Sequence, residues 1–70
     1  MKKKKISEKA SDIYEMLQQY QAVNGFYPSI RELAEIFDLS DFTVRYHLQK
    51  LQDAKYINRV QNKSRAYEIL

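Results

Sequence analysis

The side chains best suited to binding chemistry are basic, hydroxylic and aromatic, and they gather in two segments of the chain. Arginine and lysine bind phosphate, arginine also pairs bidentately with guanine, and apolar groups pack against the methyl group of thymine. Without elements to place them, such residues would be ordinary solvated surface groups. The first segment contains Ser40, Phe42, Thr43, Arg45, Tyr46, Gln49 and Lys50, and the second contains Asn62, Lys63, Ser64 and Arg65.

The composition argues against an enzyme. A chain of 70 residues, of which 44% are hydrophobic, must use nearly all of its apolar side chains in one core. The absence of cysteine excludes thiolate ligands and cysteine nucleophiles, and the single glycine leaves no Gly-rich phosphate loop. We therefore predict a binding module that needs no metal or other cofactor and has no evident small-molecule ligand.

The net charge of +3 at pH 7 is distributed unevenly along the chain. Residues 1–5 carry four lysines, residues 6–38 carry a net charge of −4, and residues 39–70 carry a net charge of +3. We interpret residues 1–5 as a disordered basic tail that weakly anchors phosphate, and residues 6–70 as one domain. The basic second half suits a nucleic-acid ligand.

Hydrophobic spacing predicts three helices in the first 55 residues. The first is capped by Ser7 and ends at Asn24-Gly25, because both residues of that pair readily adopt the left-handed conformation. Ser29 and Glu32 form a capping-box pattern that opens the second helix, and Ser40 caps the third. The predicted inner faces are Ala10, Ile13, Tyr14, Leu17 and Tyr20; Ile30, Leu33, Ala34 and Phe37; and Val44, Leu48 and Leu51.

Two strands are predicted after the third helix. Residues 56–60 and 66–70 are rich in β-forming residues, and the polar loop 61–65 separates them. Tyr67 and Ile69 share one face of the second strand, whereas the pattern of the first strand leaves its buried face undecided. The predicted fold class is therefore mainly α with a small β-hairpin.

The segment from residue 31 to residue 48 has the pattern of a helix-turn-helix. Two helices joined by three residues must cross steeply, so they need a small residue where they touch, a turn residue that tolerates unusual dihedral angles, and a compact apolar plug. Ala34, Asp38 and Val44 supply these types in that order. With the basic hairpin as a wing, the chain is predicted to be a three-helix winged helix-turn-helix.

These motifs resemble the winged helix-turn-helix DNA-binding domain of bacterial regulators, and the N-terminal domain of LexA-type repressors in particular. The resemblance covers residues 6–70. It implies sequence-specific binding of double-stranded DNA by a transcriptional repressor that occupies an operator. Because a lone module of this size buries only about 600–1,000 Å² on DNA, we expect two copies on a palindromic operator, as a homodimer formed on DNA or through the exposed surface of the first helix. The motifs are Leu33-Ala34, Leu39-Ser40, Thr43-Val44 and His47-Leu48, with Ile6-Ser7, the run from Asn24 to Ser29, and Ser64-Arg65 as flanks.

The chain also departs from the LexA pattern. Lys55 and Ala66 stand where that family tends to have glycine, and the inter-helix turn is one residue shorter. The residues between 42 and 46 do not match the base-reading set of LexA, so the resemblance does not carry its operator over. LexA-type repressors continue into a self-cleaving serine–lysine domain, and because this sequence ends at Leu70 we expect no self-cleavage from it.

Groove geometry suggests roles for the third helix. A recognition helix enters the major groove with its N-terminal residues nearest the base edges. Arg45 is then placed for guanine, Phe42 or Thr43 for thymine methyl groups, and Ser40 for a phosphate. Tyr46, Gln49 and Lys50 complete the predicted contact face.

Two further phosphate contacts are predicted outside the third helix. Ser29 and Arg31 lie at the start of the second helix, where free backbone N–H groups and the helix dipole favour anions. Asn62, Lys63, Ser64 and Arg65 form a wing tip suited to an adjacent phosphate or the minor groove. A Lys63 substitution should weaken binding to all sequences alike.

Several aromatic positions have two interpretations. Phe42 fits a core position as well as a base contact, and Tyr46 slightly favours exposure. His47 is expected to be packed or bonded to the backbone, because no metal partner lies near it in sequence. We expect core and rim packing, in preference to base stacking, for the tyrosines at positions 14, 20, 56 and 67.

Alternative functions also remain at this stage. One is an excision or replication accessory protein of a mobile element, and another is a protein-interaction module on a winged-helix scaffold. The chain contains no apolar run of spanning length. We expect a cytoplasmic protein, associated with a bacterial nucleoid or encoded by a phage or mobile element.

Overall fold

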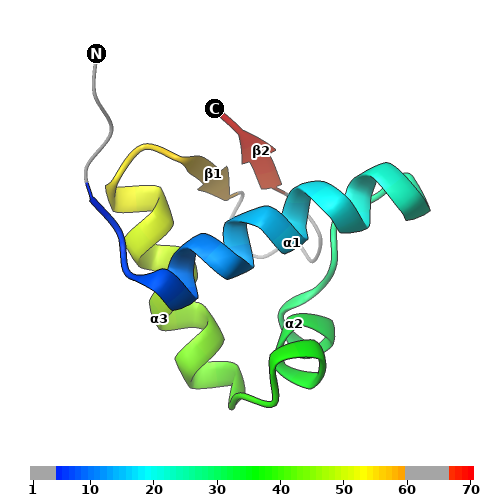
Figure 1. Ribbon diagram of the computed structural model, residues 1–70, viewed down its shortest axis with the longest axis horizontal. Helices are drawn as coiled ribbons and strands as arrows, with labels where there is room; N and C mark the ends of the chain where they lie inside the picture. The colour runs from blue at the N-terminus through cyan, green and yellow to red at the C-terminus, as the bar shows by residue number, and fades with distance from the viewer. Residues whose placement is uncertain (1–4, 60–66) are drawn as a thin grey trace.

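The computed structural model describes residues 5–59 and 67–70, as three helices followed by a two-stranded antiparallel sheet (Figure 1). The arrangement confirms the mainly α fold with a small hairpin, consistent with a winged helix-turn-helix. The elements are α1 (Glu8–Asn24), α2 (Ile30–Phe37), α3 (Asp41–Asp53), β1 (Ile57–Arg59) and β2 (Tyr67–Ile69).

Both ends of α1 are set by the residues that the sequence predicts. The hydroxyl of Ser7 accepts a hydrogen bond of 3.2 Å from the N–H of Ala10, which satisfies one donor of the first turn. Gly25 ends the helix with φ +82°, a left-handed conformation that costs glycine little. Local chemistry alone therefore explains the length of α1.

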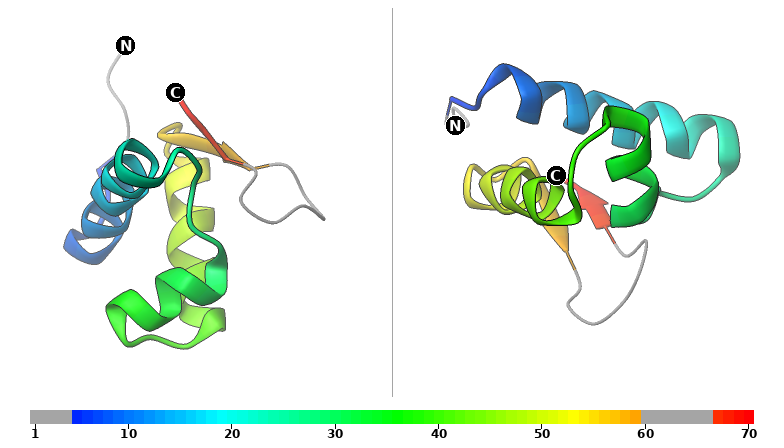
Figure 2. Two further views of the ribbon diagram at one scale, coloured as in Figure 1. Left: turned by 90° about the vertical axis from the view of Figure 1, so that its right-hand side faces the viewer. Right: turned by 90° about the horizontal axis from the view of Figure 1, so that it is seen from below.

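The turn between α2 and α3 is held by backbone bonds. Asp38 has φ +55°, and the N–H of Leu39 donates to the carbonyl of Ala34 at 2.9 Å. Leu39 packs against the core from this turn. Figure 2 shows the result, since α2 crosses the end of α3 steeply instead of running back along it.

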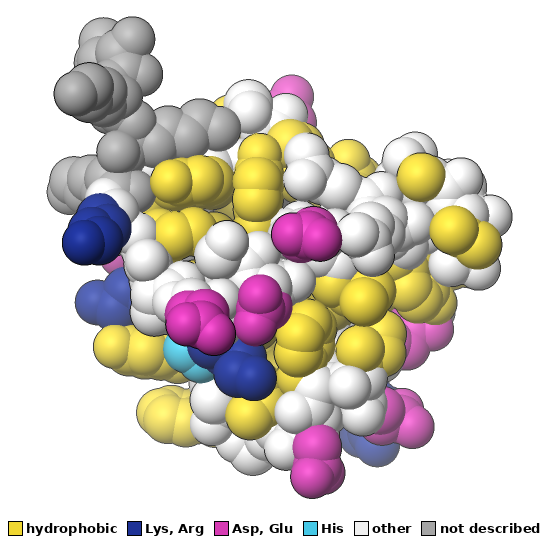
Figure 3. Space-filling model, viewed as in Figure 1, with side chains coloured by type: hydrophobic (Ala, Val, Ile, Leu, Met, Phe, Trp, Pro, Cys, Tyr) yellow, Lys and Arg dark blue, Asp and Glu magenta, His cyan; other side chains and the backbone are white. Residues whose placement is uncertain are grey.

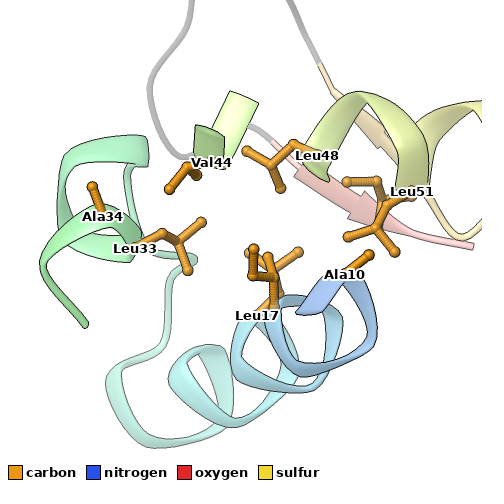
Figure 4. Packing of buried hydrophobic residues seen from close by; sticks show 9 residues of the cluster. Ala10, Leu17, Leu33, Ala34, Val44, Leu48 and Leu51 are labelled. Atoms are coloured by element: carbon orange, nitrogen blue, oxygen red, sulfur yellow. The ribbon is translucent and has the colours of Figure 1, made fainter. Parts of the chain in front are cut away.

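One hydrophobic cluster holds all the helices and β1. Both α1 and α2 pack against α3, and the side chains of Leu17, Leu33 and Leu48 point toward one another across these interfaces (Figure 4). Each of these three leucines is fully buried. The cluster consists of Ala10, Ile13, Leu17, Leu33, Ala34, Val44, Leu48, Leu51 and Ile57.

β1 begins one residue later than the sequence predicts, and β2 ends one residue earlier. Tyr56 lies before β1, not in it, and Leu70 follows β2. Ile57 pairs with Ile69 and is fully buried, which resolves the face that the pattern left undecided. The predicted wing tip, 62–65, lies outside the described residues.

The tyrosines serve packing between elements, as expected. The rings of Tyr14 and Tyr56 meet edge to face with their centroids 5.1 Å apart, which joins α1 to the start of the hairpin. The hydroxyl of Tyr20 donates to the Oε2 atom of Glu32 at 3.0 Å, which joins α1 to α2. Tyr67 is half-buried against the core.

Lys55, like Asp38, is a non-glycine residue with a positive φ, at +68°. A left-handed conformation is strained for a residue with a Cβ atom, and Lys55 stands where the resembled family tends to have glycine. We expect Lys55→Gly to raise the free energy of unfolding by about 0.5–1 kcal/mol, because the relief of strain exceeds the entropy that glycine loses. Thermal denaturation should show a melting temperature several degrees higher.

Lys55→Ala is the matched control, because it removes the same charge and keeps the Cβ atom. It should give no such gain. Equal melting temperatures for the glycine and alanine variants would show that the backbone conformation at this position is not strained.

Candidate nucleic-acid interface

The outer face of α3 is exposed because its inner face is the centre of the core. Val44, Leu48 and Leu51 are fully buried, so helical periodicity turns the remaining positions outward. Phe42 is 79% exposed, which rules out the interpretation that it belongs to the core. The predicted contact residues that are exposed within α3 itself are Phe42, Arg45, Tyr46, Gln49 and Lys50, and the cap residue Ser40 is also exposed.

The N-terminus of α3 uses its two hydroxyl groups internally. The Oγ atom of Ser40 accepts from the N–H of Thr43 at 3.1 Å and donates to the Oγ1 atom of Thr43 at 2.9 Å. Thr43 is only partly exposed. Contacts of these two side chains with DNA stay predictions, and each would have to be made alongside, or in place of, the cap.

Two contacts order the second half of the outer face. The Nζ atom of Lys50 lies 5.3 Å from the centroid of the Tyr46 ring, within the range of a cation–π interaction. The Nε2 atom of Gln49 donates to the Oδ1 atom of Asp53 at 2.9 Å. This bond uses one of the two N–H donors of Gln49, and the other N–H and the Oε1 atom remain for a base.

Arg45 is exposed on this face. Within residues 5–59 and 67–70, its guanidinium group has no hydrogen-bond or ion-pair partner. An arginine without a partner on the protein keeps its full donor set for an external acceptor. Arg45 is therefore the polar side chain of α3 that is best prepared for a ligand.

The start of α2 is less open to anions than the sequence suggests. The Oε1 atom of Glu32 accepts from the N–H of Ser29 at 2.8 Å, and the Oγ atom of Ser29 accepts from the N–H of Glu32 at 3.1 Å. This capping box places a carboxylate at the turn where the sequence predicts an anion site. The exposed side chain of Arg31 and the unpaired N–H groups of the first turn remain for a phosphate contact.

The exposed charges of α1 and α3 are balanced differently. Glu8, Asp12 and Glu15 are exposed along α1, and Figure 3 shows acidic side chains across the middle of this face. On α3, the exposed charged side chains are Arg45, Lys50 and Asp53. Among the described residues, the exposed cations Arg45 and Lys50 make α3 a surface that could attract a polyanion.

A groove beside α3 was not foreseen from the sequence. It has a volume of about 500 Å³ and lies between residues 5–7 and the second half of α3. No local pattern signals it, because these segments approach only in the folded chain. Its lining residues are Lys5, Ile6, Ser7, Tyr46, His47, Lys50, Asp53 and Ala54.

His47 is partly buried, in agreement with the first of its two predicted alternatives, packing or a bond to the backbone. Its Nδ1 atom is buried and has no hydrogen-bond partner in the part of the chain that the structure describes. Burial, with a smaller contribution from the positive charge of Lys9, lowers the pKa of His47 below its ordinary value of 6.5. Burial therefore favours the neutral form of the imidazole.

The lowered pKa predicts a loss of stability in acid. The unfolded chain binds the His47 proton more readily than the folded chain, so the free energy of unfolding falls as the pH drops below about 6.5. We expect a modestly lower melting temperature at about pH 5.5 than at about pH 7.5, because the ring is still partly solvated. His47 is the only histidine, so His47→Gln should abolish the difference. An unchanged pH dependence in that variant would contradict the assignment.

Among the described residues, no three or more histidine, cysteine, aspartate or glutamate side chains form a group that could hold a metal ion. No helix in the described part of the chain has the length and apolar character needed to cross a membrane.

Comparison with known proteins agrees with this geometry. A family model described as the LexA DNA binding domain matches residues 3–66. LexA repressors of Staphylococcus aureus strains Newman, Mu3 and USA300 are each 37% identical to this chain over 68 residues, which is 96% of this chain and 33% of each relative. The chain thus spans about a third of the length of the curated relatives it matches. These matches show that the chain belongs to the LexA DNA-binding domain family, and the three helices of the structure agree with them.

Proposed function

We propose that this chain binds double-stranded DNA sequence-specifically and acts in transcriptional repression by occupying an operator. The observation that carries the proposal is the outer face of α3, where Arg45 is exposed and has no partner among the described residues, on a helix fixed by the core. Membership of the LexA DNA-binding domain family supports it. We infer that the domain itself acts by binding and not by catalysis.

The proposed mechanism places α3 in the major groove. Arg45 then meets base edges, while Lys50 and the start of α2 meet the sugar–phosphate backbone. The exposed acidic side chains of α1 belong to a different helix from the proposed contacts. Blocking access of polymerase to the occupied site would produce repression.

We propose further that two copies bind a palindromic site. A single module of this kind buries about 600–1,000 Å² on DNA, an area that gives limited affinity. Two copies on adjacent half-sites would add their contacts. A footprint that remains confined to one asymmetric half-site at saturation would contradict this part of the proposal. As a DNA-binding protein of this family, the chain would work in the bacterial cytoplasm.

A second candidate is a protein-interaction module on the same scaffold. The exposure of Phe42 and Tyr46, at 79% and 53%, favours it, because exposed aromatic side chains are common at protein interfaces. An accessory role in excision or replication would use the same DNA contacts and would differ from repression only in the process that the bound protein affects.

The test is a selection of bound duplexes from random sequences, followed by affinity measurements across salt concentrations. DNA binding predicts an enriched sequence and a logarithmic affinity that falls with the logarithm of salt, with a slope of about −0.9 for each phosphate contacted. A protein-interaction module predicts no enriched sequence. That result would contradict the proposed function.

A further inference from the structure

Two aromatic side chains on α3 are not explained by folding. Phe42 is 79% exposed and Tyr46 is 53% exposed, whereas Tyr14 and Tyr56 pack against each other beside the core. Exposed aromatic rings of this size are found more often at binding surfaces than elsewhere on a protein surface. The exposure of Phe42 and Tyr46 therefore indicates a ligand with apolar groups.

The two rings lie on one line along the helix. They are four residues apart, so they share the face opposite Val44 and Leu48. Four residues rise by about 6 Å along an α-helix, close to two base steps of about 3.4 Å each. The spacing of the rings thus fits groups repeated at that interval.

The charges around the rings select the kind of ligand. Arg45 is exposed between them in sequence, and the Nζ atom of Lys50 lies 5.3 Å from the centroid of the Tyr46 ring. The cation beside Tyr46 and the exposed Arg45 on the same helix favour a polyanion that also presents apolar groups. In the major groove of DNA, the 5-methyl group of thymine is the apolar group available to a side chain.

The structure also favours Phe42 over Thr43 for contact with a thymine methyl group. Thr43 is an equal candidate for thymine contact by sequence, but it is partly buried and its hydroxyl accepts from Ser40 at 2.9 Å. Phe42 and Tyr46 have the exposed apolar area instead.

We propose that Phe42 and Tyr46 each pack against the 5-methyl group of a thymine, so that a half-site contains two such thymines about two base steps apart. The inference rests on the proposed DNA binding of α3 and adds the base that its aromatic residues recognise.

The experiment uses the duplex obtained by selection, with each thymine replaced in turn by uracil. Uracil lacks only the methyl group and keeps the same base pairing. Wild-type affinity is expected to fall about fourfold at each of two positions, the effect of exposing one buried methyl group. Phe42→Ala should lose the response at one position, and Tyr46→Ala should lose it at the other.

Val23→Ala is the matched control, because Val23 is an exposed apolar residue on α1, away from the outer face of α3. It should respond to uracil as the wild type does. Specific binding with no response to uracil, or responses unchanged in both alanine variants, would overturn the inference and leave the proposed function intact. The absence of any preferred sequence would overturn both. A change in the size of the free protein on Phe42→Ala would assign the rings to a second copy and overturn the inference.

Discussion

Arg45→Ala is expected to abolish most of the sequence preference while leaving binding to unrelated DNA nearly unchanged. A bidentate contact with guanine discriminates by about 1–3 kcal/mol, so affinity for the selected site should fall about 5- to 150-fold. Binding to unrelated duplexes depends mainly on phosphate contacts, which this variant largely keeps. Titration of the selected duplex and a scrambled duplex at one salt concentration gives both values.

Two further variants separate charge from geometry. Arg45→Lys keeps the positive charge but lacks the planar pair of donors, so it should lose preference for the selected site almost as fully as alanine. Arg31→Ala removes a predicted phosphate contact and should weaken the selected and the scrambled duplex by similar factors. If all three variants behaved alike on both duplexes, Arg45 would not be the base-reading residue.

The largest expected effect on stability is that of Leu48→Ala. Leu48 is fully buried in the cluster where α1 and α2 meet α3. Truncating such a leucine lowers the free energy of unfolding by about 2–5 kcal/mol, from a total of about 4–10 kcal/mol for a chain of this length. We expect a melting temperature at least ~10 °C lower, or a largely unfolded protein at 37 °C.

Phe42→Ala on the same helix is the control for this prediction. It removes a larger side chain, but that side chain is 79% exposed, so the free energy of unfolding should change by no more than about 0.5 kcal/mol. Similar melting temperatures for the Leu48 and Phe42 variants would contradict the position of Leu48 in the core. Chemical denaturation monitored by circular dichroism measures both.

Features that depend on neighbouring residues could be predicted from the sequence. Ser7, Ser29 and Ser40 cap the three helices because a hydroxyl reaches an N–H group only three residues ahead. Asp38 and Gly25 end their helices for similarly local reasons. The helix-turn-helix is predictable for the same reason, since its turn and contact positions lie within one short segment.

Features that depend on distant residues could not be predicted in this way. The exposure of Phe42 depends on which side of α3 the other two helices pack against, not on its own neighbours in sequence. A strand of three residues is too short for alternation to reveal that Ile57 is buried. The groove beside His47 forms because residues 5–7 lie against α3. No residue spacing in the sequence predicts this contact.

The start of α2 illustrates a different limit. The sequence correctly predicts that Ser29 and Glu32 form a capping box, and it also predicts that the same turn binds an anion. Both expectations rest on the same unpaired N–H groups, and the carboxylate of Glu32 takes one of them. The capping box and the anion site compete for these N–H groups. Only the atomic positions show which N–H groups the capping box takes.

The shared core of the three helices has a kinetic consequence. Because Leu33, Leu48 and Leu17 belong to one cluster, α3 cannot unwind without exposing apolar surface on α1 and α2 as well. Amide hydrogens in α3 should therefore exchange at rates set by global unfolding, not by local opening. A helix that keeps its shape between encounters loses little conformational entropy when it docks, so association proceeds without a folding step.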